Sequence, residues 1–472
     1  MERYNVIVIG AGSGGLVVAA GAAGLGARVA LVEKHKMGGD CLNYGCVPSK
    51  ALLRAAKAAQ EAREAHRFGV RGVADPGPQD AKTVMDWVRA CQAKIAPHDS
   101  VERFTGLGVE VFLGAGRLRN SHEVEVDGKT LWGRHVVIAT GSRAFIPETP
   151  GLKEAGFLTN ETVFDVETLP GHLVVFGGGP IGCELGQAFR RLGSKVTILS
   201  SREHVVPKED PDVAAVLAKR LRAEGIEILD KAKADRVELR DGKKIVHVAG
   251  RELACDAILV SAGRRAVVDG LGLDAAGVAH DGRGVTIDAN CRTNVPNVWA
   301  VGDVAGPFQF THWAGHQARV VIQNILFPVK AKFDADNLPW TTFTDPEIAH
   351  VGLNESEAKR RDVEHVVVSS DFGHNDRAIC DGTDADHFAK VIATPKGKIL
   401  GATIVHPHAG DLLAELVLAK KHGISLSKLS GTIHAYPTLS EIGRALGDAY
   451  RRTTLTPGTK ARLTKVYAWL RR

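Results

Sequence analysis

A glycine-rich turn that occurs twice, each time between an apolar run and a helix-forming stretch, constrains this fold more than any other feature. The first turn, residues 10–15, follows the β-branched run 5–9 and precedes an alanine- and glycine-rich stretch. A second apolar run then ends at Glu33. Strand, G-x-G-x-x-G, helix, strand and acid, in this order, are typical of a dinucleotide-binding unit. A glycine-rich turn with no ligand is the alternative.

Each residue of this first turn has its own physical role in the predicted site. Gly10 permits the tight turn, Gly12 lets the backbone approach a pyrophosphate, and Gly15 lets the helix pack on the strand. The phosphate charge would lie on the free amides of the helix N-terminus. The Glu33 carboxylate is expected to accept hydrogen bonds from a ribose diol.

The second turn, residues 177–182, precedes a helix-forming stretch that continues to Arg191. Its glycines, Gly177, Gly179 and Gly182, predict a second dinucleotide site. The next strand, 195–199, ends without an acid, because Ser200, Ser201 and Arg202 follow it. Hydroxyls and an arginine accommodate a 2′-phosphate that a carboxylate would repel, so Ser201 and Arg202 favour NADPH over NADH. Alternatively, Arg202 is a solvated loop charge.

Two cysteines, Cys41 and Cys46, lie five residues apart between the two turns. On an ideal helix a rise of about 7.5 Å would hold them farther apart than the roughly 4.4–6.8 Å between Cα atoms that a disulfide needs. The backbone must therefore bend if they pair, and Gly45 can bend it without steric cost. Pro48 suits the first turn of a following helix, whose N-terminus would stabilise a thiolate. We predict a redox-active pair; a structural disulfide or two unrelated thiols are the alternatives.

Composition argues against several classes of protein. Seven cysteines in 472 residues are too few for a secreted disulfide scaffold, and residues 1–8 show no signal peptide. No apolar run reaches the roughly 20 residues of a membrane span. The formal charge of +6 is small and has no basic block behind it. We expect a cytoplasmic protein without nucleic-acid or membrane partners, where a disulfide-capable pair is more often catalytic than structural.

With these motifs in family order, the chain resembles the pyridine nucleotide–disulfide oxidoreductases, which include dihydrolipoamide dehydrogenase, glutathione reductase and mercuric reductase. Residues 139–142 match the family's link between nucleotide domains, and residues 298–303 match its second flavin motif. The resemblance implies an α/β fold with two Rossmann-like domains, for FAD and NAD(P), and a C-terminal α/β dimerisation domain that forms a homodimer. We predict four regions: 1–146 and 271–338 for FAD, 147–270 for NAD(P), and 339–472 for dimerisation.

The resemblance also implies roles for individual residues. Cys46 would face the flavin as a thiolate, and Cys41 would be the interchange thiol that attacks the substrate. Lys50 and Glu184 would form an ion pair beside the flavin. Further FAD contacts are implied for Thr140, Gly141 and Asp303. Electrons would pass from NADPH, or NADH, through FAD and the disulfide to a third party, and no metal is expected.

The chain departs from this family near its C-terminus. Members that act on lipoamide or glutathione carry a catalytic histidine where this chain has Tyr436, while Glu441 keeps the position of the orienting acid. A phenol with a reference pKa near 10 is a poor proton shuttle at pH 7, whereas an imidazole near 6.5 is a good one. By resemblance, residue 436 would come from the partner subunit and face Cys41. His434, two residues upstream, is a candidate substitute base, although a hydrogen-bonded structural histidine is the simpler interpretation.

We therefore expect an FAD-dependent NAD(P)H oxidoreductase that reduces a small-molecule or protein disulfide, or another electrophile, through Cys41 and Cys46. One alternative is a metal-ion reductase of the mercuric type or a quinone reductase. For the mercuric type, residues 464–472 lack the vicinal cysteines that such relatives carry near the C-terminus. Two further alternatives are a dihydrolipoamide dehydrogenase with a substitute base and a non-enzymatic flavin redox sensor.

Overall fold

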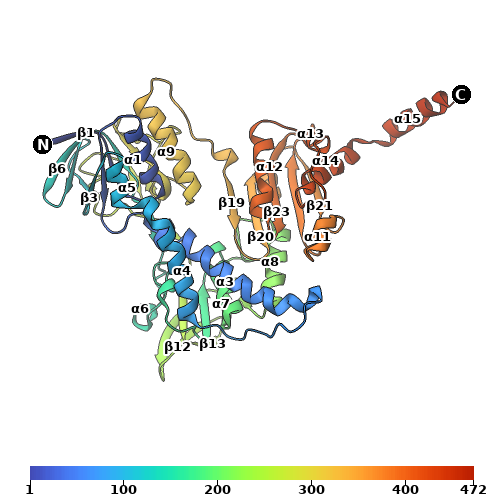
Figure 1. Cartoon of the computed structure of the whole chain (residues 1–472), viewed down its shortest axis with the longest axis horizontal. Coiled ribbons are helices and arrows are strands. Elements are labelled where there is room, and N and C mark those ends of the chain that lie inside the picture. The colour runs from blue at the N-terminus through green and yellow to red at the C-terminus, as the bar shows by residue number, and fades with distance from the viewer. Residues whose placement is uncertain (472) are drawn as a thin grey trace. The chain divides into compact units, whose positions relative to one another are not determined.

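The computed structural model describes residues 1–471, which form two compact units (Figure 1). Unit 1 comprises residues 1–203 and 224–334, and unit 2 comprises residues 204–223 together with residues 335 onward. The mixed α/β architecture confirms the predicted fold class. The boundaries of the four predicted regions stay a prediction.

A seven-stranded sheet forms the N-terminal part of unit 1, in the order β3-β2-β1-β6-β5-β4 with β18 beside β6. Its strands are β1 (Glu2–Ile9), β2 (Val29–Glu33), β3 (Val109–Leu113), β4 (Arg117–Leu118), β5 (Glu123–Val126), β6 (Lys129–Ile138) and β18 (Val298–Ala300). Five of these strands, β3, β2, β1, β6 and β18, run parallel. Val8 pairs with Leu31 on one side and Val137 on the other. Helices α1 (Ser13–Gly24) and α9 (Thr311–Leu326) contribute to the core on the face of Val6 and Val8. Apolar side chains cover both faces, as expected for parallel strands with continuous apolar sequence.

A second, four-stranded parallel sheet in unit 1 has the order β10-β9-β8-β14. These strands are β8 (His172–Phe176), β9 (Lys195–Leu199), β10 (Glu227–Leu229) and β14 (Ala257–Val260), with α7 (Pro180–Leu192) between β8 and β9. An antiparallel sheet of β11 (Arg236–Arg240), β12 (Lys243–Val248) and β13 (Arg251–Cys255) adjoins it, and both contribute to one core. Small pairs are β7 (Ser142–Ala144) with β15 (Arg264–Ala266), and β16 (His280–Asp281) with β17 (Gly284–Val285).

Most of the remaining helices of unit 1 follow β2 and precede β3 in the sequence. They are α2 (Gly39–Asn43), α3 (Cys46–Glu64), α4 (Ala81–Ile95), α5 (Val101–Gly106) and α6 (Leu152–Ala155), with 3₁₀ turns η1 (Ala65–Phe68), η2 (Ala96–Asp99), η3 (Val163–Asp165) and η4 (Gly302–Val304). Helix α3 packs on both α4 and α7, so the cysteine segment is joined to the helix of the second glycine-rich turn.

Unit 2 is built on a five-stranded antiparallel sheet in the order β19-β20-β23-β22-β21. The strands are β19 (Pro339–Thr342), β20 (Glu347–Gly352), β21 (Val366–Asp371), β22 (Phe388–Ala393) and β23 (Ile399–His406). The helices are α8 (Pro211–Ala223), α10 (Glu355–Arg360), α11 (Asp376–Cys380), α12 (Ala409–Lys421), α13 (Leu426–Ser430), α14 (Glu441–Thr454) and α15 (Pro457–Leu470), after a 3₁₀ turn η5 (Ala335–Asn337). Helices α12 and α14 contribute apolar side chains to its core.

Residues 204–223 belong to unit 2 because buried charges tie them there. Lys390 on β22 is buried and pairs with Asp210 and Asp212 at 2.8 Å each. Trp340 on β19 donates its indole N–H to Glu209 at 2.7 Å. These contacts join residues that lie more than a hundred positions apart. Across residues 1–471, no helix combines the length and apolarity that a bilayer crossing requires.

Candidate active site

The first glycine-rich turn has the geometry that a bound dinucleotide needs. Gly10 has φ +107°, and a Cβ there would lie 2.4 Å from the carbonyl oxygen of Ala139. A Cβ on Gly15 would lie 1.8 Å from the carbonyl oxygen of Gly10. Gly12 differs, because the nearest atom to a Cβ there is the Cα of Gly39 at 3.9 Å. The space above Gly12 is therefore open to a pyrophosphate, while Gly10 and Gly15 are glycines for packing reasons.

The acid at the end of β2 is buried and fixed in direction. The Glu33 carboxylate accepts the backbone N–H of Ala11 and that of His35, each at 2.7 Å. Each oxygen keeps a further lone pair, so the carboxylate can still accept a ribose hydroxyl. The residues present at this end of the sheet thus fit the adenosine half of FAD.

Asp303, from the predicted second flavin motif, lies in η4 and is held by a polar network. Ser142 donates its hydroxyl to Asp303 at 2.5 Å, and the guanidinium of Arg264 lies 3.7 Å from the same oxygen. Burial raises the pKa of Asp303 above its ordinary value. Gly141 has φ +70°, and Thr140 donates its hydroxyl to the carbonyl of Val267 at 2.8 Å. Thr140 and Gly141 therefore form the bend from which Ser142 reaches Asp303.

The cysteine pair lies where one helix ends and another begins. Cys41 is in α2, and Cys46 is the first residue of α3, with the helical path broken at Tyr44 and Gly45. A Cβ on Gly45 would lie 2.8 Å from Asp40 Oδ2, so this glycine also makes room for a neighbour. The bend predicted between the cysteines is present, and both thiols are unlinked.

The two thiols differ strongly in acidity. The pKa of Cys46 is lowered to about 6, first because Cys41 donates a hydrogen bond to it, then because Thr311 and the Lys50 cation favour the thiolate against the opposing effect of burial. The pKa of Cys41 is raised by the same hydrogen bond and by burial. These opposite shifts favour the thiolate on Cys46 and the proton on Cys41.

Groups from distant parts of unit 1 meet at this thiolate. The hydroxyl of Thr311, at the start of α9, lies 3.2 Å from Cys46 Sγ. Lys50, one turn along α3, donates to Glu184 of α7 at 2.8 Å, and the Glu184 side chain is buried. Thr311 was not singled out by the sequence analysis, because a hydroxyl 265 residues away carries no local signal.

The second glycine-rich turn repeats the steric pattern of the first. Gly177 has φ +129°, and a Cβ there would lie 2.4 Å from the carbonyl oxygen of Ser261. A Cβ on Gly182 would lie 1.9 Å from the carbonyl oxygen of Gly177, whereas nothing lies within 4 Å of one on Gly179. The turn is therefore also open at its middle glycine, as a bound pyrophosphate requires.

At the end of β9, Ser200 is buried, and Ser201 and Arg202 are exposed. No hydrogen bond or ion pair of the Arg202 guanidinium occurs within residues 1–471. The next residue, Glu203, pairs with Lys231 at 2.9 Å. Glu203 therefore places a carboxylate directly after the expected phosphate-binding arginine, a neighbour that the motif alone did not draw attention to.

The C-terminal residues form a different arrangement from a histidine–acid dyad. Tyr436 is 71% exposed and donates its hydroxyl to Asp376 of α11 at 2.8 Å, which raises its pKa. Glu441 accepts from Arg444 at 2.8 Å and from the Thr438 backbone at 3.5 Å. The nearest acid bonded to Tyr436 is thus Asp376, a residue that the sequence analysis missed.

His434 is held by a contact of its own. Its Nε2 lies 2.9 Å from Glu415 of α12, its Nδ1 lies 3.1 Å from the carbonyl of Thr432, and its side chain is 7% exposed. Both ring nitrogens are engaged, which supports the structural interpretation of this histidine over the substitute base.

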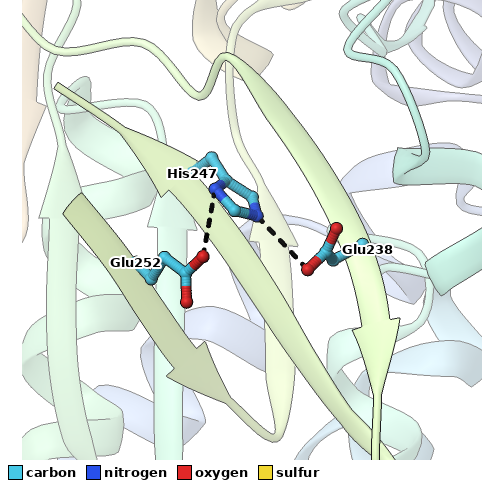
Figure 2. Close-up of side chains that lie close together, drawn as sticks. All are labelled: Glu238, His247 and Glu252. Carbon is cyan, nitrogen blue, oxygen red and sulfur yellow. Dashed lines mark ion pairs between the residues drawn. The ribbon is translucent and has the colours of Figure 1, made fainter. Parts of the chain in front are cut away.

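One group of metal-ligating side chains occurs within the described residues, away from the cysteines. Figure 2 shows His247 of β12 between Glu238 and Glu252, with one carboxylate facing each ring nitrogen at 3.5 and 3.7 Å. Both carboxylates are already paired with Arg240. Because the two acids face opposite nitrogens and are neutralised, this cluster is an ion-pair network on the sheet face.

Unit 1 therefore brings together two glycine-rich dinucleotide-binding turns, a pair of thiols whose pKa values are shifted in opposite directions, and a lysine–glutamate ion pair. That combination defines a flavin- and nicotinamide-dependent dithiol oxidoreductase. Residues 4–318 match the family model for pyridine nucleotide-disulphide oxidoreductases, and residues 338–446 match its dimerisation domain. The chain belongs to this family, which confirms the resemblance stated from the motifs.

Relatives of this chain carry two kinds of name. It is 35% identical over 458 residues to a dihydrolipoyl dehydrogenase of Chlamydia trachomatis, covering 93% of this chain and 95% of the relative. It is 37% identical to that of Thermus scotoductus, with 93% and 96% covered. Among solved structures, the Cu(II) complex of the HOCl-induced flavoprotein disulfide reductase RclA from Escherichia coli is 28% identical, with a TM-score of 0.84 and coverage of 96% and 99%. LpdA from Mycobacterium tuberculosis is 26% identical, with a TM-score of 0.86 and coverage of 96% and 100%.

The predicted enzyme class and cofactors are confirmed at the level of the family. The chain is an NAD(P)H-dependent flavoprotein disulfide oxidoreductase, and the family uses FAD. It carries a dimerisation domain. The names of the relatives differ in the acceptor they indicate.

Proposed function

We propose that this enzyme takes electrons from NADPH and uses Cys41 and Cys46 to reduce a disulfide or another electrophilic acceptor, and that dihydrolipoamide is a poor substrate. The observation that carries the proposal is the position of the two thiols at the junction of α2 and α3, with Cys46 Sγ 3.2 Å from the Thr311 hydroxyl and the Lys50–Glu184 ion pair one turn further along α3. Bound FAD would supply the transfer of electrons between the nicotinamide and the cysteine pair. The unpaired guanidinium of Arg202 supports NADPH, while Glu203, directly after it, is the group that would weaken this preference.

The reaction on the cysteines balances without an external base. Cys41 passes its proton to the Cys46 thiolate along their hydrogen bond, and the Cys41 sulfur attacks one sulfur of the acceptor disulfide. A mixed disulfide forms, and the first acceptor thiolate leaves. That leaving thiolate takes the proton from Cys46, and the resulting Cys46 thiolate closes the Cys41–Cys46 disulfide and expels the second acceptor sulfur as a thiolate, which solvent protonates. The acceptor gains two electrons, and the cysteine pair loses two.

Dihydrolipoamide oxidation runs in the opposite direction and needs a base to remove the substrate's proton. Tyr436 is unsuited to that role because its hydroxyl donates to Asp376 and its pKa is raised. His434 is engaged by Glu415. We propose Tyr436 and Glu441 as residues of the acceptor side that do not act as a histidine–acid dyad. A second candidate acceptor is Cu(II), supported by the likeness to RclA, whose structure was solved as a Cu(II) complex.

The test is NADPH oxidation by purified holoenzyme with oxidised glutathione, lipoamide, Cu(II), Hg(II) and quinones in turn. We expect turnover with at least one acceptor, lost in both Cys41→Ser and Cys46→Ser. Arg202→Gln should raise the KM for NADPH and leave that for NADH unchanged. Flavin reduction without turnover on any acceptor would contradict the proposal and favour a redox sensor. Turnover that survives both serine variants would indicate direct transfer from the flavin, as in a quinone reductase.

We further propose that the enzyme is a cytoplasmic homodimer without nucleic-acid or membrane partners. The match of residues 338–446 to a dimerisation domain supports the dimer. The small net charge and the sparse cysteines support the proposed cytoplasmic location and the proposed absence of nucleic-acid and membrane partners.

A further inference from the structure

Arg264 on β15 joins three segments of unit 1 that lie far apart in the sequence. Its Nε donates to the Ser142 hydroxyl at 2.7 Å, and its Nη2 donates to the Ser142 carbonyl at 3.1 Å. Nη2 also lies 3.2 Å from Asp40 Oδ1, and Nε lies 3.7 Å from Asp303 Oδ2. The arginine side chain is only 12% exposed. One buried cation is therefore shared by the acid next to Cys41 and the acid of the second flavin motif.

Asp40 is a residue of α2 whose carboxylate lies close to the start of α3. A Cβ on Gly45, the residue before Cys46, would lie 2.8 Å from Asp40 Oδ2. The other oxygen, Oδ1, faces Arg264 and accepts from the side-chain amide of Asn160 at 2.9 Å. Because both donors hold Oδ1, the carboxylate keeps Oδ2 toward the helix that begins at Cys46. A negative charge left uncompensated at this place would oppose a thiolate on Cys46.

The polar groups around Cys46 come from α2, α3, α7 and α9: Cys41 and Asp40, Lys50, Glu184, and Thr311. The hydrogen bond from Cys41 lowers the pKa of Cys46 most, burial opposes it, and the charge of Asp40 raises that pKa as well. Glu184 is paired with Lys50 at 2.8 Å, and Asp40 is paired with Arg264. The partner of Asp40 therefore bears on how readily Cys46 carries a negative charge.

We propose that Arg264 is a positioning residue of the redox centre, which neutralises and orients Asp40 and so removes the charge that would oppose the Cys46 thiolate. The amide of Asn160 can orient the same carboxylate, but a neutral donor cannot offset its charge. Arg264 is thus the group that supplies the counter-charge. This role rests on the proposed action of the cysteine pair, and not on which acceptor the enzyme reduces.

The test is alkylation of the reduced, anaerobic holoenzyme by iodoacetamide between pH 5 and pH 9, with modified Cys46 located by peptide mass spectrometry. Arg264→Gln should raise the pH midpoint of Cys46 alkylation by roughly half a unit to one unit, because Asp40 loses its counter-charge. Asp40→Asn should lower the midpoint below that of the wild type. Adding Arg264→Gln in the Asp40→Asn background should shift the midpoint by less than half as much as in the native background, since the charge to be neutralised is gone.

Arg265→Gln is the matched control. Arg265 is the next residue on β15, is exposed, and projects from the opposite side of the strand. This variant removes the same charge one position along the chain, so its midpoint should coincide with that of the wild type. The long-wavelength absorbance of the two-electron-reduced enzyme provides a second readout. Its pH midpoint should move in Arg264→Gln in the same direction as that of alkylation, and should stay in place in Arg265→Gln.

Coincident midpoints for Arg264→Gln and the wild type would overturn the proposal. Equal shifts in Arg264→Gln and Arg265→Gln would overturn it too, because the effect would then come from the overall positive charge. An Arg264→Gln shift of the same size in the Asp40→Asn background would show that the arginine acts without Asp40, which also contradicts the proposal. Where Arg264→Gln does not retain FAD, Asp40→Asn decides: a lowered midpoint supports the role, and an unchanged or raised one refutes it.

The outcome is separable from that of the proposed function. Loss of turnover in Cys41→Ser and Cys46→Ser, together with an unshifted midpoint in Arg264→Gln, would refute the role of Arg264 and leave the proposed function standing. Turnover that survives both serine variants, together with a shifted midpoint, would do the reverse.

Discussion

Removing one hydroxyl, in Thr311→Val, should change the acidity of the cysteine pair measurably. The Thr311 hydroxyl lies 3.2 Å from Cys46 Sγ and favours its thiolate. A hydrogen bond to a charged group contributes about 1.5–3 kcal/mol, and about 1.36 kcal/mol corresponds to one pKa unit. We therefore expect the pKa of Cys46, now about 6, to rise by roughly one to two units.

The sign of the pH dependence follows from which form reacts. Only the thiolate is nucleophilic, so alkylation of Cys46 rises as pH increases through its pKa. At pH 7 the thiolate should make up about nine-tenths of Cys46 in the wild type. In Thr311→Val, a pKa raised by roughly one to two units should leave about half of Cys46 or less as thiolate. The rising limb of the profile should move to higher pH in the variant, with the same plateau.

The assay is alkylation of the reduced enzyme by iodoacetamide between pH 5 and pH 9, with modified Cys46 quantified by peptide mass spectrometry. Thr311→Ser is the matched control, because it keeps the hydroxyl, and its midpoint should stay at the wild-type value. A Thr311→Val midpoint that coincides with those of the wild type and of Thr311→Ser would refute the reasoning. The low pKa would then depend on Cys41 and Lys50 alone.

Other predictions concern the cofactor, the thiols, the acceptor side and the packing of the turns. Purified protein should be yellow and contain about one FAD per chain, and a colourless, folded preparation would end this interpretation. Two-electron reduction should give a long-wavelength thiolate-to-flavin absorbance that Cys46→Ser abolishes and Cys41→Ser retains; if both variants keep it, the assignment is wrong. Tyr436→His should raise the dihydrolipoamide rate, since a general base contributes roughly 10²–10⁴-fold, and a wild type already as fast as its histidine-bearing relatives would contradict this. Gly39→Ala should lower the melting temperature, because its Cβ would lie 2.6 Å from the Cα of Gly12 at φ +58°; an unchanged melting curve would count against the tight approach of these two turns.

Local sequence was sufficient to predict the elements around each glycine-rich turn. The turn at Gly10 and the turn at Gly177 need positive φ, and the apolar runs before them are continuous because parallel strands are covered on both faces. The bend between Cys41 and Cys46 was likewise predictable, since five residues of unbroken helix cannot bring the two side chains together. These features depend on neighbours within a few residues, which a sequence displays directly.

What the sequence by itself determined is therefore the class of chemistry: two dinucleotide-binding turns, a thiol pair between them and a tyrosine where the family resemblance implies a histidine. The tertiary structure decided which thiol has the lowered pKa, because Thr311, 265 residues from Cys46, and the Lys50–Glu184 pair meet only after folding. It also decided that Tyr436 bonds to Asp376 and that residues 204–223 pack in unit 2. Contacts of this kind join residues far apart in the chain through packing and charge, and such pairings leave no periodic or local mark in the sequence.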